Sequence, residues 1–80
     1  MSEQVTYLEA VKRALAHSLE DDPRVVLLGE DIAAYGGAFK LTQGFLERFG
    51  PDRVIDTPIV ETGLVGAAIG AGMAGLRPVV

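Results

Sequence analysis

The chain has 80 residues, of which 49% are hydrophobic and 22% charged, and its net charge is −4. This composition excludes an intrinsically disordered chain, and a chain of this length forms at most one small core, which buries roughly 60% of its unfolded surface. The Lys and Arg residues are scattered and the net charge is negative, so nucleic acid is not expected as a partner. The lack of cysteine excludes disulfides, thiolate metal ligands and thiol nucleophiles.

The first residues and the longest uncharged stretch bear on location. The start, Met1–Gln4, has neither the cationic and apolar pattern of a secretory signal nor the Arg-rich pattern of a transit peptide, so we expect a cytoplasmic protein. The uncharged stretch 62–76 is shorter than the ~20 apolar residues that a membrane span requires. We therefore expect no membrane as a partner.

The first predicted element is a helix from about Thr6 to Glu20. Thr6 and Glu9 form a capping-box pattern, in which each side chain satisfies a free backbone amide at the helix start. Apolar residues share one stripe of this helix: Leu8, Val11, Leu15 and Leu19. His17 lies half a turn away among polar residues, and we expect it to be solvated.

A buried strand, a loop and a short helix are predicted next. Pro23 ends the first helix, and Val25–Leu28 is a continuous apolar run typical of a strand buried on both faces in a parallel sheet. The paired glycines within Ile32–Lys40 favour a loop. Leu41–Phe49 then predicts a helix, which Gly50 and Pro51 end.

The last third of the chain predicts a strand at 53–56, a helix from Glu61 and a further strand from Pro78. Helices and strands thus alternate, which predicts an α/β fold with a parallel sheet flanked by helices. Because the sequence stops inside an apolar strand, we expect residues 1–80 to be the N-terminal piece of a longer polypeptide.

Small residues recur every fourth position in the last helix, at Gly66, Gly70 and Ala74. This spacing places them on one helical face, which another backbone can approach closely. We expect a tightly packed partner helix on this face, either from the same domain or from another subunit.

Glu61 is the candidate functional residue, because it is a single carboxylate at the start of an otherwise uncharged helix. Burial of a carboxylate costs free energy unless the group binds something specific. The alternative is a solvated first-turn glutamate that the helix dipole favours. Spacing alone leaves both interpretations open.

Several segments together resemble a known family: Gly29–Asp31, Tyr35–Lys40, Asp56–Gly63 and Gly75–Pro78. The chain is similar to the beta subunit of the thiamine-diphosphate-dependent first component of 2-oxo acid dehydrogenase complexes, from about Thr6 to Val80. The resemblance implies that residues 1–80 open a transketolase-like pyrimidine-binding domain. The remainder of that domain and a C-terminal domain would lie outside this sequence.

The resemblance also implies roles for two residues. Glu61 is expected to hydrogen-bond the ring nitrogen of the cofactor's aminopyrimidine and to share a proton with it, which helps the cofactor to form its nucleophilic carbon. Ile59 is expected to pack against the pyrimidine. Thr62 departs from the family pattern, which usually has a larger apolar residue at that position.

The implied site is only half present. In the family, a Gly-Asp-Gly motif on the alpha subunit holds Mg²⁺ and the diphosphate, and no such motif occurs here, so we expect no metal ligand on this chain. The implied partners are the alpha subunit, a second beta subunit in a heterotetramer, a lipoyl-bearing acyltransferase component and a small 2-oxo acid. The reaction is oxidative decarboxylation with acyl transfer to the lipoyl group, and residues 1–80 alone are expected to be inactive.

Other interpretations stay open. Gly70–Gly75 matches the G-x-G-x-x-G pattern of a dinucleotide site, with Leu64–Ile69 as its preceding strand. The last helix could instead belong to a non-catalytic packing module. Glu30 and Asp31 fit a strand-end turn better than a metal site, and the loop Tyr35–Lys40 is either a mobile surface loop or a lining of the cofactor or substrate approach.

Overall fold

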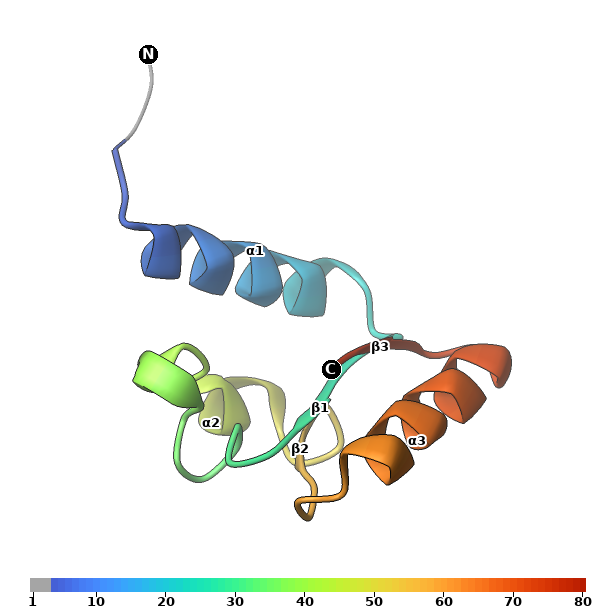
Figure 1. The fold of residues 1–80 in the computed structure, drawn as a ribbon. Coiled ribbons are helices and arrows are strands. Elements are labelled where there is room, and N and C mark those ends of the chain that lie inside the picture. Colours follow the sequence, from blue (N-terminus) through green and yellow to red (C-terminus); the bar gives the residue numbers. More distant parts are fainter. Residues whose placement is uncertain (1–3) are drawn as a thin grey trace.

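Three parallel strands form the centre of the fold in a computed structural model that describes residues 4–80 (Figure 1). The strand order is β2-β1-β3, so β1 is central, and Leu27 of β1 is in register with Val54 of β2 and with Val79 of β3. The elements in chain order are α1 Tyr7–Asp21, β1 Val25–Gly29, the 3-10 turn η1 Ala38–Lys40, α2 Phe45–Phe49, β2 Val54–Asp56, α3 Glu61–Met73 and β3 Arg77–Val79. The predicted parallel α/β sheet with flanking helices is confirmed.

The core lies between one face of the sheet and the helices α1 and α2. Leu19 of α1, Phe45 of α2 and Val54 of β2 are each at most 3% exposed, and they cluster with Val25 and Leu27. Connections between parallel strands are right-handed, so two connections that run in opposite directions along a sheet place their helices on opposite faces. The connections from β1 to β2 and from β2 to β3 run in opposite directions, and α3 lies across the sheet from α2 (Figure 1). Helix α3 contributes no buried residue, so its outer side is uncovered.

Helix α1 begins as predicted, but with half of the expected capping box. The Thr6 hydroxyl accepts a hydrogen bond from the Glu9 amide at 3.1 Å. The Glu9 carboxylate pairs with Arg13 at 3.0 Å instead of reaching back to the helix start. His17 is exposed, as predicted, and lies 2.9 Å from the carboxylate of Asp21.

The predicted helix Leu41–Phe49 is wrong in its first half. Residues 41–44 form hydrogen-bonded turns, and α2 covers only Phe45–Phe49. Gly44 has φ of +87°, which a right-handed helix does not contain, and the Thr42 hydroxyl donates to the carbonyl of Ile32 at 2.7 Å. The conformation of Gly44 therefore prevents α2 from extending back to Leu41.

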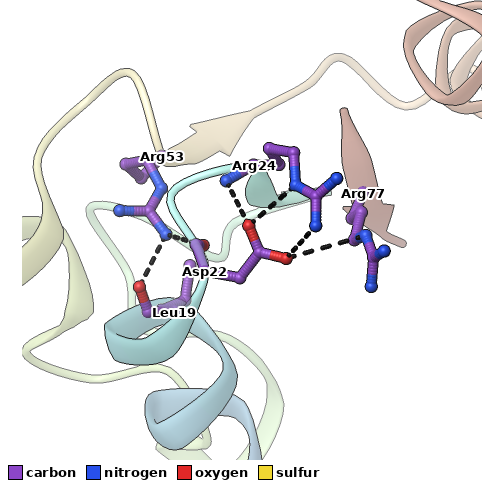
Figure 2. A network of polar contacts seen from close by, with 5 residues as sticks. All are labelled: Leu19, Asp22, Arg24, Arg53 and Arg77. Atoms are coloured by element: carbon purple, nitrogen blue, oxygen red, sulfur yellow. Dashed lines mark hydrogen bonds and ion pairs between the residues drawn. The ribbon is translucent and has the colours of Figure 1, made fainter. Parts of the chain in front are cut away.

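At the amino edge of the sheet, Arg53 joins three elements (Figure 2). Its guanidinium donates to the carbonyls of Leu19 at 2.7 Å and Asp22 at 3.0 Å, and also to the carbonyl of Val25 at 2.8 Å. The first two carbonyls belong to the last turn of α1 and its C-cap, where backbone acceptors have no partner within the helix. Arg53 thus fixes the end of α1 against β1 and β2.

Asp22 forms the other half of this network (Figure 2). Its carboxylate accepts from the backbone amide of Arg24 at 2.9 Å and from the Arg24 side chain at 3.0 and 3.1 Å, and Arg77 lies 3.6 Å away. These hydrogen bonds, above all the one from the Arg24 side chain, favour the ionised form and lower the pKa of Asp22 from 3.8 to about 2.

This lowered pKa predicts an acid-dependent loss of stability. Because the folded pKa is below the unfolded value, the Asp22 carboxylate stabilises the fold above pH 4 and this contribution disappears between about pH 4 and pH 2. In the complete polypeptide, Asp22→Asn should therefore lower the thermal midpoint at pH 7, and the difference from wild type should disappear as pH falls to 2. A thermal melting series over this pH range measures it. A gap of equal size at pH 7 and pH 2 would contradict the prediction.

Candidate functional site

The candidate site lies at the carboxyl edge of the sheet. Gly29 at the end of β1 and Asp56 at the end of β2 are register partners, so the segments that follow both strands begin side by side. Residues 57–60 then lead directly to Glu61, the first residue of α3. Crevices outside the carboxyl ends of parallel strands are where α/β sheets bind their ligands.

Glu61 is exposed at this edge. No hydrogen bond or ion pair involving its carboxylate is present among residues 4–80, and the N-cap residue Val60 has no side chain that could cap the helix. The free amides at a helix start favour a negative charge beside them. Glu61 is therefore an unengaged carboxylate in an electrostatically favourable position.

Two uncovered aliphatic side chains flank this carboxylate. Ile59 is 75% exposed and Val60 is 53% exposed. The structure thus brings the two predicted site residues, Ile59 and Glu61, to one short segment at the sheet edge. A single exposed aliphatic side chain is ordinary on a protein surface. Two exposed aliphatic side chains beside an unengaged carboxylate form an apolar surface with one polar group.

Thr57 adds an unsatisfied polar atom that the sequence does not reveal. Its amide donates to the carbonyl of Gly29 at 2.8 Å, which holds the residue against the end of β1. Its hydroxyl oxygen is buried and has no hydrogen-bond partner in the described part of the chain. Buried polar atoms without partners are rare in native proteins, so the Thr57 hydroxyl requires an explanation.

This set of residues fits an aromatic ring that carries a basic nitrogen. Glu61 can hydrogen-bond such a nitrogen, and aliphatic side chains can cover the ring face. Within residues 4–80 there is no group of three or more His, Cys, Asp or Glu side chains that could hold a metal ion, and Glu30 and Asp31 lie in the turn that follows β1. The described residues at this edge are thus one unengaged carboxylate beside two exposed aliphatic side chains.

Two apolar hollows among the described residues lie elsewhere. One has a volume of about 210 Å³ and is lined by residues of α1, β1 and the end of the chain, including Leu15, Leu27 and Val79. The other, of about 450 Å³, lies between α1 and η1. Neither includes Ile59 or Glu61 among its lining residues. The candidate site is thus an open edge, as a half-site would be.

The loop Tyr35–Lys40 is held by several internal hydrogen bonds. The Gly37 amide donates to Asp31 at 2.7 Å, and the Thr42 amide donates to Gly36 at 2.8 Å. The Lys40 ammonium group donates to the carbonyl of Tyr35 and lies 3.7 Å from the centre of its ring. Phe39 lines the larger hollow with residues of α1.

The small-residue face of α3 has no neighbour. No atom of residues 4–80 lies within 4 Å of a Cβ built at Gly66 or Gly70, apart from the local helix backbone and adjacent residues. Val65, Ile69 and Met73 of the same helix are 52%, 60% and 86% exposed. A partner helix within the described residues is therefore excluded, and the prediction of one from elsewhere stays a prediction.

The dinucleotide interpretation is wrong. Leu64–Ile69 lies inside α3 and not in a strand, and the glycine pattern Gly70–Gly75 covers the end of that helix instead of its start. A dinucleotide motif needs its glycines between a strand and the amino end of a helix, where free amides bind phosphate. In this fold the glycines lead into β3 at the opposite edge of the sheet from Glu61.

Within residues 4–80, no helix is both long and apolar enough to cross a membrane.

The expectation of a cytoplasmic location is wrong as an inference from the first residues. Similar proteins from Chaetomium thermophilum, 55% identical, and Dictyostelium discoideum, 44% identical, are named mitochondrial beta subunits of the pyruvate dehydrogenase E1 component. A similar protein from Rickettsia bellii, 53% identical, has the same subunit name without that word. The pattern at Met1–Gln4 therefore does not distinguish the compartments in which such proteins occur.

These similarities cover nearly the whole chain but a small part of each relative. The alignments include 95%, 96% and 99% of this chain, and only 20%, 24% and 22% of the proteins from Chaetomium, Rickettsia and Dictyostelium. The chain thus spans about a quarter or less of the length of these relatives. The family model described as "Transketolase, pyrimidine binding domain" matches residues 3–80. The chain belongs to the family of the transketolase pyrimidine-binding domain.

Proposed function

We propose that residues 1–80 are the N-terminal part of a 2-oxo acid dehydrogenase beta subunit, which supplies the pyrimidine-side half of a thiamine diphosphate site. One observation carries the proposal: the unengaged carboxylate of Glu61 lies at the carboxyl edge of the sheet in a chain that is 55% identical to a pyruvate dehydrogenase E1 beta subunit. Both the position and the family support a role in cofactor binding.

The proposed roles are those that the family resemblance implies, and the exposed positions of Ile59 and Glu61 at this edge support them. Glu61 would hydrogen-bond the ring nitrogen of the aminopyrimidine, and Ile59 would cover the ring. When bound, thiamine diphosphate supplies the carbanion chemistry of decarboxylation. Once ring and partner subunit exclude water, the carboxylate of Glu61 would share a proton with the nitrogen and so place that proton at a defined atom.

The proposed partners are those that the resemblance to E1 beta subunits implies. An alpha subunit would complete the site with Mg²⁺ and diphosphate ligands, and a second beta subunit would complete the assembly. A lipoyl-bearing acyltransferase component would receive the acyl group. The uncovered side of α3, with Ile69 60% and Met73 86% exposed, supports contacts with further protein segments.

The substrate class is tested with the polypeptide that carries this sequence, co-expressed with its alpha subunit. We expect thiamine-diphosphate-dependent oxidation of a 2-oxo acid, with pyruvate favoured over branched-chain 2-oxo acids because the relatives are pyruvate dehydrogenase subunits. Equal or greater activity on branched-chain acids would overturn the choice of pyruvate. No cofactor-dependent activity on any 2-oxo acid would overturn the proposed function.

A second candidate function is a non-catalytic packing module. The open small-residue face at Gly66 and Gly70 favours it, because such a face suits close helix contact and needs no carboxylate. The two functions differ at Glu61, since a packing module tolerates loss of the acid and a cofactor site does not.

We also propose that the domain continues beyond these residues, because the chain covers about a quarter or less of its relatives' length. The intact mass of the native polypeptide should therefore be far above 8.4 kDa. An isolated peptide of residues 1–80 should be inactive and should melt without a cooperative transition, because α3 buries no residue against the sheet. Mass spectrometry and calorimetry check both results. A cooperative transition of the isolated peptide would contradict the prediction that residues 1–80 do not fold stably alone.

A further inference from the structure

The side chain of Asp56 connects the two segments that follow β1 and β2. Its carboxylate oxygens accept hydrogen bonds from the backbone amides of Ala33 at 2.6 Å and of Ala34 at 3.4 Å. Asp56 is the last residue of β2, whereas Ala33 and Ala34 follow the turn after β1. One carboxylate side chain thus joins two segments that are more than twenty residues apart in sequence.

The loop on the β1 side needs such a contact. Asp31 has φ of +56°, a conformation that costs a residue with a side chain of order 1 kcal/mol and persists only where surrounding contacts hold it. Its carbonyl accepts from the Gly37 amide at 2.7 Å, and the Ile32 carbonyl accepts from the Thr42 hydroxyl at 2.7 Å. Asp56 supplies acceptors for the next two amides of this loop.

The segment on the β2 side is the connection that carries Ile59 and Glu61. It begins with the hydrogen bond from the Thr57 amide to the Gly29 carbonyl, continues through Pro58, whose φ is fixed by its ring, and ends with the Val60 amide donating to Pro58 at 2.9 Å. Few free torsions separate Asp56 from Glu61. A displacement of Asp56 relative to the β1 loop would therefore move Glu61 as well.

We infer that Asp56 is a positioning residue, whose carboxylate fixes the Glu61 connection relative to the loop after β1. This inference rests on the proposed function, since it assigns Asp56 an effect on the same half-site. Asp56 is exposed, so its replacement leaves the core unchanged and should affect the site more than the overall stability.

The experiment compares Asp56→Ala and Asp56→Asn with Asp52→Ala in the complete polypeptide assembled with its alpha subunit. Asp52 is a matched control, because it is exposed near the other end of β2 and makes no hydrogen bond or ion pair in the described structure. The measured quantities are thiamine diphosphate affinity, kcat and KM, the thermal midpoint, and hydrogen exchange of peptides that cover residues 30–40.

For Asp56→Ala we expect cofactor affinity and kcat to fall roughly 10-fold to 100-fold, because small displacements of a positioned group have effects of this size. The KM for the 2-oxo acid should change less, and amide exchange in residues 30–40 should be faster. Asp56→Asn retains one acceptor oxygen and should be intermediate. Asp52→Ala should match wild type in all four measurements.

Two results would overturn the inference. One is Asp56→Ala with cofactor affinity, kcat and exchange equal to those of Asp52→Ala. The other is a fall in thermal midpoint with unchanged cofactor affinity and kcat, which would show a purely structural contact. Glu61→Gln, measured in parallel, separates the two proposals: full activity of that variant would reject the proposed function itself, whereas an inactive Glu61→Gln beside a fully active Asp56→Ala would reject only the role of Asp56.

Discussion

Replacement of Glu61 by Gln should lower turnover of a 2-oxo acid by roughly 10²-fold to 10⁴-fold, which is the usual contribution of a positioned acid or base. The amide of glutamine can still hydrogen-bond a ring nitrogen but cannot share a proton with it as a carboxyl group does. Assembly with the alpha subunit should be unchanged, because Glu61 is exposed and its carboxylate makes no hydrogen bond or ion pair within residues 4–80. Steady-state kinetics and size-exclusion chromatography measure the two quantities.

Two further variants make this result specific. Glu61→Asp keeps the acid but shortens its reach by one methylene group, so its turnover should lie between wild type and Glu61→Gln. Glu47→Gln makes the same chemical change on α2, at an exposed glutamate outside the candidate site, and should retain wild-type turnover. Near wild-type turnover of Glu61→Gln would reject the role of this residue in the reaction.

The alternative role of Glu61 predicts a different outcome. A solvated first-turn glutamate contributes only about 0.3–1 kcal/mol through the helix dipole. Under that interpretation Glu61→Gln would lower the thermal midpoint slightly and leave turnover unchanged. Measuring both quantities in one preparation therefore distinguishes a cofactor anchor from a helix-start charge.

The elements whose signals are local were predictable from the sequence. The Thr6 cap marks the start of α1, and the apolar run at Val25–Leu28 marks the central strand, because each pattern is formed by residues within a few positions of one another. The position of Glu61 at the start of α3 is predictable in the same way, from one charge beside an uncharged stretch, while its role stays a prediction. The shortening of α2 is not predictable in this way, because the sequence pattern of Leu41–Phe49 does not reveal that Gly44 adopts φ of +87°.

Contacts between distant segments were not predictable. Asp56 reaches amides 22 and 23 residues away, and Arg53 reaches carbonyls up to 34 residues away. Their partners are backbone groups, which every residue has, so no residue type at the far end reveals the pairing. Both residues become recognisable only when the parallel register has brought the strand ends together.

Replacement of Arg53 by Met should destabilise the protein by about 2–3 kcal/mol. Hydrogen bonds that involve a charged group contribute about 1.5–3 kcal/mol, and carbonyl groups left without a donor add a desolvation cost. Methionine keeps much of the aliphatic stem but loses all three donors to Leu19, Asp22 and Val25. Chemical denaturation of the complete polypeptide measures the change, provided that the transition is two-state.

Arg48→Met is the matched control for this change. Arg48 is exposed and pairs with Glu20, so its loss should cost less than about 1 kcal/mol, as for other surface ion pairs. Arg53→Lys should recover part of the stability, because an ammonium group still donates but cannot reach the carbonyls of α1 and β1 in the fixed geometry of a guanidinium. Equal destabilisation by Arg53→Met and Arg48→Met would contradict this prediction. It would show that the apolar core around Leu19, and not Arg53, holds α1 against the sheet.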